Sequence, residues 1–146
     1  MRIKVLGLLC CLLAICGCVH DNFIIQEYQS SSEHFDEDAW RDHTHYCEYY
    51  YKKENISLFE KSQYYTQVTH QDIQRLKGFV GNFKEWIALK DGYKNWYHFN
   101  EKQISINDYF RLEVKDPDEV YGEYHCYDIY YFDVNECTLY YMSSYS

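Results

Sequence analysis

The chain has little positive charge, almost no proline and no apolar stretch long enough to cross a membrane. Its 14 Lys and Arg against 23 Asp and Glu give a formal net charge of −9, which argues against nucleic acid or anionic lipid as a direct partner. The apolar run over residues 3–15 has about 13 residues, whereas a membrane-spanning helix needs about 20. A single proline beside 18 Tyr, 8 Phe and 3 Trp favours β-sheet.

The short motifs of common active sites are also missing. The sequence has no nucleophile elbow, no phosphate-binding loop and no H-E-x-x-H pattern, and its carboxylates are scattered. His98 and His125 fall in expected strands and are interpreted as structural. We therefore expect no catalytic activity and no cofactor.

The amino terminus carries the most specific motif. Arg2 and Lys4 lie at the start of this segment, and Ile15-Cys16-Gly17-Cys18 closes it. This tetrapeptide resembles the lipobox of bacterial lipoprotein signal peptides, with Cys16 where Ala or Ser is commoner. The resemblance implies cleavage of residues 1–17, acylation of Cys18 and, with Val19 following, an anchor in the outer membrane facing the periplasm. The alternative is ordinary signal-peptide cleavage at Ala14-Ile15-Cys16.

The mature chain divides into a tether and one domain. Loss of residues 1–17 leaves 12 basic and 23 acidic residues, a formal charge of −11. Residues 18–39 contain a serine triplet and several acidic residues, which predicts a lipidated acidic tether. Residues 40–146 have the length of a single globular domain. Residues 130–133 and 138–141 resemble the tails of small uncharacterised proteobacterial lipoproteins, which carry no known activity.

The clearest predicted element is a helix over residues 69–89. Thr69 and Asp72 suggest a capping box, and apolar residues recur at helical spacing at Ile73, Leu76, Val80, Phe83 and Ile87. Strands are predicted at 44–52, 109–114, 124–132 and 137–142, with shorter ones at 56–59, 63–68 and 96–99. The predicted fold class is α+β, one long amphipathic helix packed on an antiparallel sheet of four to six strands. The alternative is a sheet closed into a barrel around the helix.

A turn over residues 133–136 joins the last two predicted strands. If residue 132 faces 137, Cys126 and Cys137 lie about 20 Å apart along the sheet, beyond the roughly 7 Å that a disulfide tolerates. This pair is therefore not expected to bridge. The sequence is compatible with a disulfide from Cys47 to Cys126 or Cys137, and equally with three buried free thiols.

The sequence offers two candidate sites besides Cys18. Since one helix covers only one face of a sheet, one set of tyrosines should face water and bind a partner: Tyr127, Tyr131 and Tyr140, or Tyr130 and Tyr141. His43, His45 and Cys47 alternate on one strand and are weak candidates for a metal site, although no metal is expected. The preferred function is a non-catalytic protein-binding module, inhibitor-like or immunity-like, for a basic envelope protein. The alternatives are a structural or assembly component of the envelope and a metal-binding protein or enzyme.

Overall fold

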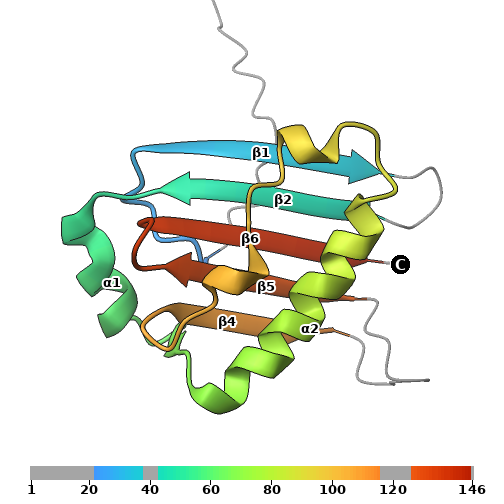
Figure 1. Cartoon of the computed structure of the whole chain (residues 1–146). Coiled ribbons are helices and arrows are strands. Elements are labelled where there is room, and N and C mark those ends of the chain that lie inside the picture. The colour runs from blue at the N-terminus through green and yellow to red at the C-terminus, as the bar shows by residue number, and fades with distance from the viewer. Residues whose placement is uncertain (1–21, 38–42, 116–125, 146) are drawn as a thin grey trace, which may run out of the picture.

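The computed structural model describes residues 22–37, 43–115 and 126–145, and Figure 1 shows their arrangement. Six strands form one antiparallel sheet in the order β1-β2-β6-β5-β4-β3. This order leaves β1 and β3 as edges, so the sheet is open and the fold is α+β. The strands are β1 (Ser30–Glu37), β2 (His43–Tyr50), β3 (Thr66–Gln67), β4 (Tyr109–Val114), β5 (Tyr127–Asp133) and β6 (Thr138–Tyr145).

Helix α2 (His70–Ile87) packs across one face of this sheet (Figure 1). Thr69 and Asp72 form the expected capping box, in which the Thr69 backbone N–H donates to Asp72 Oδ2 at 2.9 Å. A Cβ at Gly78 or Gly81 would meet nothing within 4 Å, so neither glycine marks a close approach to the sheet. The helix buries one stripe in the core, made of Leu76, Phe79, Val80, Phe83 and Ile87.

Among the residues that the structure describes, the opposite face of the sheet is covered at one end only. The short helix α1 (Ile56–Lys61) places Phe59 against Phe132, with the two rings stacked and their centroids 3.6 Å apart. Residues 22–28 extend this second apolar cluster. The Tyr51 hydroxyl holds that segment by donating to the carbonyl of Ile25 at 2.7 Å. The domain therefore has two cores, a large one under α2 and a smaller one under α1.

The hairpin between β5 and β6 has a different register from the expected one. Phe132 pairs with Leu139, two residues beyond the predicted partner. The turn is longer because Asp133 Oδ1 accepts from the N–H of Asn135 and of Glu136, at 2.8 and 3.0 Å, and Cys137 adopts a positive φ of 51°. A shift of two residues keeps each side chain on its face, so the assignment of tyrosines to the two faces agrees with the structure.

Three segments differ from the sequence-based expectation. Residues 30–37, expected within the tether 18–39, form strand β1 and pair along their whole length with β2. Residues 56–61 form α1 instead of a strand, and residues 96–99 lie outside the strands. The helical residues are thus divided between α1, the 18-residue α2 and three 3₁₀ helices, where one long helix was expected. The 3₁₀ helices are Lys53–Asn55, Tyr93–Asn95 and Glu101–Gln103.

The described cysteines are not joined by a disulfide. Cys47 of β2 pairs with Tyr141 of β6. Cys137 lies opposite Tyr51 instead, since its carbonyl accepts from the Tyr51 N–H, and Tyr51 is four residues beyond Cys47. Four residues of strand span about 13 Å, far beyond the reach of a disulfide. Cys126 lies before β5, at the other end of the sheet from Cys137. The sheet therefore does not bring Cys47 to either expected partner.

Residues 1–17 and Cys18 lie outside the described residues, so the signal peptide and the lipidation site have no structural description. Within the described ranges, no helix combines the length and the apolar character needed to cross a membrane.

Candidate functional site

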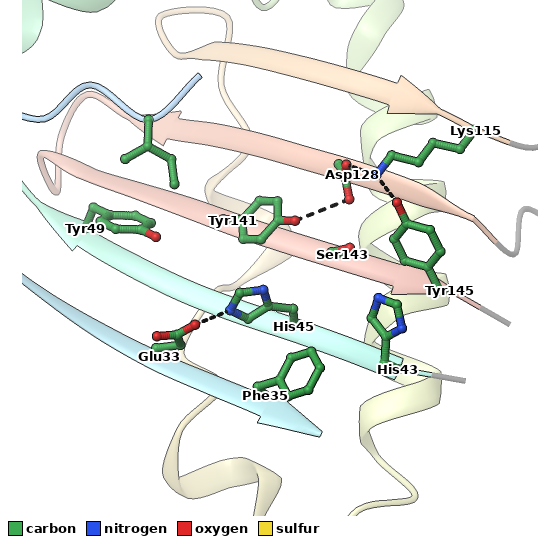
Figure 2. A pocket seen from close by; sticks show the side chains of 11 residues that line it. Glu33, Phe35, His43, His45, Tyr49, Lys115, Asp128, Tyr141, Ser143 and Tyr145 are labelled. Carbon is green, nitrogen blue, oxygen red and sulfur yellow. Dashed lines mark hydrogen bonds and ion pairs between the residues drawn. The ribbon is translucent and has the colours of Figure 1, made fainter. Parts of the chain in front are cut away.

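The end of the second sheet face that no described segment covers forms a pocket of about 470 Å³ (Figure 2). Alternate residues of paired strands project to the same side and form its floor. Phe35, His45 and Ser143 belong to one row across β1, β2 and β6, which Asp128 of β5 continues. Figure 2 shows these side chains converging from strands that are far apart in the sequence.

Aromatic rings surround the pocket and contact one another. His43 stacks on Tyr145 with ring centroids 4.4 Å apart. Phe35 and Tyr141 each approach the His45 ring edge-on, at 5.4 and 5.2 Å. Phe35 is 53% exposed, a high value for a large apolar side chain on a strand. The pocket thus offers apolar surface next to imidazole groups that donate or accept hydrogen bonds.

A buried carboxylate stands at the β4 side of the pocket. Asp128 is 3% exposed and forms an ion pair with the Lys115 ammonium group at 2.5 Å. Lys115 also donates to the Tyr145 hydroxyl, and Tyr141 donates to Asp128 at 3.4 Å (Figure 2). Burial lowers the pKa of Lys115, but the bonds to Asp128 and Tyr145 outweigh it, so the net shift is upward. Lys115 therefore remains charged and neutralises Asp128.

At the β1 side, three chemically different ligand atoms converge. His45 Nε2 lies 2.6 Å from Glu33 Oε1 and 3.1 Å from Cys47 Sγ. All three atoms lie within 4.8 Å of one another. Tyr49 borders the group: burial raises the pKa of its phenol, and so does its hydrogen bond to Cys47. Glu33 and His45 line the pocket, whereas Cys47 lies beneath it at 2% exposure.

The face under α2 contains a separate polar network. Glu48 is 2% exposed and accepts from the Tyr46 hydroxyl at 2.7 Å and from Tyr50. His98 Nδ1 lies 2.9 Å from the same carboxylate. The Tyr46 hydroxyl also accepts from the backbone N–H groups of His98 and Phe99, at 3.3 and 3.2 Å. This network ties the loop over residues 96–99 to the sheet, and we interpret it as structural.

The structure separates the two predicted sets of tyrosines. Tyr127, Tyr131 and Tyr140 are buried under α2, so they form core and no partner surface. On the other face Tyr130 is only 1% exposed beside α1. Tyr141 alone of the five lines the pocket. The expectation that a whole tyrosine set faces water is therefore wrong, because residues 22–28 and α1 cover part of the second face.

The predicted metal candidates are also regrouped. His45 and Cys47 stay together, but His43 stacks on Tyr145 and is not part of the cluster. Glu33 takes its place and was missed because its segment was assigned to the tether. His34 and Phe35 are adjacent in a segment of otherwise Ser, Asp and Glu, so no period-2 alternation marked it as a strand.

Comparisons with known proteins return no relative. No protein-family model, no curated protein and no solved structure matches this chain.

Proposed function

We propose that this protein is a lipid-anchored lipoprotein of the bacterial envelope whose domain binds a protein partner without catalysing a reaction. The lipobox Ile15-Cys16-Gly17-Cys18 supports the anchor. The pocket on the second sheet face supports the binding role, and it is the single observation that carries the proposal.

The pocket has the composition of a protein-binding surface. Interfaces are enriched in aromatic residues and place a few buried anchors in pockets. Here Phe35, Tyr141 and Tyr145 surround a hollow large enough to receive a side chain from another protein. Since a concave site with exposed aromatic walls leaves apolar surface in water, its occupation by an apolar or aromatic anchor is favourable.

Charge supports a basic partner. The mature chain has a formal charge of −11, which accelerates encounter with a cationic surface at low ionic strength. Glu33 stands on the open side of the pocket with its side chain 47% exposed. Asp128 is buried and pairs with Lys115 at the β4 side. We therefore expect the acidic chain to meet a basic surface of the partner, with the β1 side of the pocket open to it.

Site-specific photocrosslinking in intact cells tests this proposal. A photoreactive amino acid replaces Phe35 in one strain and, as the matched control, Leu89 in another. Leu89 is 81% exposed and follows α2, on the other side of the sheet. We expect a discrete adduct with a basic envelope protein from position 35 and none from position 89. Equal adducts from both positions, or none from position 35, would contradict the pocket as the binding site.

A further inference from the structure

Glu33, His45 and Cys47 bring three electron-rich atoms to one point on adjacent strands. Glu33 Oε1 and Cys47 Sγ both approach the same ring nitrogen of His45, at 2.6 and 3.1 Å. An imidazole nitrogen has a single in-plane direction, which one proton or one lone pair occupies. A proton on Nε2 therefore serves one neighbour well, whereas a cation between the three atoms interacts with all of them.

We propose that Glu33 Oε1, His45 Nε2 and Cys47 Sγ bind a zinc ion at the β1 side of the pocket. A thiolate together with an imidazole favours zinc over hard cations such as calcium or magnesium. Three protein ligands leave one position of a tetrahedral site for water or an incoming group. Because Glu33 and His45 line the pocket, this fourth position is reached from there.

The distances match such a site with a small adjustment. Zinc bonds of about 2.0–2.3 Å in tetrahedral geometry place neighbouring ligand atoms about 3.3–3.6 Å apart. The distance from Nε2 to Sγ is 3.1 Å and that from Nε2 to Oε1 is 2.6 Å, so these two distances need to lengthen by less than about 1 Å. Oε1 and Sγ lie within 4.8 Å of each other. Glu33 has the freedom to move, since its side chain is 47% exposed, while Cys47 is fixed in the sheet.

Protons balance the binding step. The ion bonds to the sulfur only after the Cys47 thiol has lost its proton, and to His45 through an unprotonated Nε2. These protons leave to the solvent, and no electron is transferred. The Tyr49 hydroxyl, hydrogen-bonded to the Cys47 sulfur, is a positioning group for the thiolate.

Metal titration of the purified full-length protein in detergent tests the proposal. Cobalt serves as the spectroscopic probe, because a cobalt–thiolate bond absorbs in the near ultraviolet and tetrahedral cobalt gives intense visible bands. Zinc is then added to displace cobalt, and proton release is followed in weak buffer. We expect one cobalt per chain with a thiolate band, complete displacement by zinc, and a rise in the thermal midpoint with zinc.

Variants assign the ligands. Cys47→Ser should remove the thiolate band, His45→Gln should abolish stoichiometric binding, and Tyr49→Phe should weaken zinc binding by about 10- to 100-fold. The matched controls are Cys137→Ser, a thiol in the β5–β6 turn, and His43→Gln, an imidazole in the same pocket. Both should leave binding unchanged.

Three results would overturn the zinc site. They are a thiolate band that persists in Cys47→Ser, a loss of binding in His43→Gln as large as in His45→Gln, and no cobalt bound by the folded wild-type chain. If Cys47→Ser fails to fold, His45→Gln decides, since its partly exposed ring makes unfolding unexpected. The assay uses no protein partner, so its outcome is independent of the proposed binding function.

Discussion

Truncation of Phe59 tests whether α1 stabilises the domain by covering the second sheet face. Phe59 is completely buried and stacks on Phe132 at 3.6 Å. Its ring also packs edge-on against Tyr51 and Tyr65, each with centroids 5.0 Å away. Phe59→Ala removes these three ring contacts and leaves a cavity among aromatic side chains, which cannot flex to fill it.

A buried Phe→Ala change costs about 3–5 kcal/mol, a large share of a total stability of about 5–15 kcal/mol. Urea unfolding followed by tyrosine and tryptophan fluorescence measures the loss. With a slope of about 1–3 kcal/mol per molar urea, the midpoint should fall by about 1 M or more. Leu89→Ala is the control and should leave the midpoint unchanged, because Leu89 is 81% exposed. An unchanged midpoint in Phe59→Ala would show that α1 adds nothing and that the second core is not closed there.

Two further changes examine the anchor and a buried carboxylate. Under the proposed acylation of Cys18, the acyl chains hold the protein in the membrane, so Cys18→Ala should release it from the membrane fraction. Retention in that fraction would place the anchor elsewhere. Asp108 is 0% exposed, and burial raises its pKa above the ordinary 3.8 despite hydrogen bonds from Tyr131 and Val134. Between the ordinary pKa of the unfolded chain and the raised pKa of the folded protein, Asp108 binds more protons in the folded state. The free energy of unfolding therefore falls as the pH rises through this range. Asp108→Asn has no titrating group at this position, so a plot of the free energy of unfolding against pH, from pH 4 upward, should have a different slope from that of the wild type. Parallel plots would contradict a raised pKa for Asp108.

Periodicity predicted the elements that bury a regular stripe. α2 has a capping box and apolar residues at helical spacing, so its place was recognisable. β2, β5 and β6 were recognisable as Tyr-rich segments bounded by turn residues. α1 was missed because six residues make fewer than two turns, too few for a stripe. β1 was missed because an edge strand is half in water and tolerates the polar residues that also suggest a tether.

The candidate site was only partly predictable, because it depends on pairing between distant strands. Alternation put His45 and Cys47 on one face of β2, and that much agrees with the structure. Glu33 joins them only through the β1–β2 register, which no local pattern shows. Similarly, no sequence pattern showed that residues 22–28 cover Tyr130 while leaving Tyr141 at the pocket.

The composition of β5 and β6 changes along the same face, and this change explains why the pocket is open. At the covered end Phe132 pairs with Leu139, and both are completely buried. Four residues along, the same face holds Asp128 paired with Ser143. Asp128 is already buried, but a hydrophobic layer laid over that pair would also bury its partner Lys115, whose side chain is 39% exposed, at a cost of several kcal/mol. Within the part of the chain that the structure describes, the apolar cover therefore stops where the strands become polar, and aromatic and ligand-bearing side chains line the surface that remains.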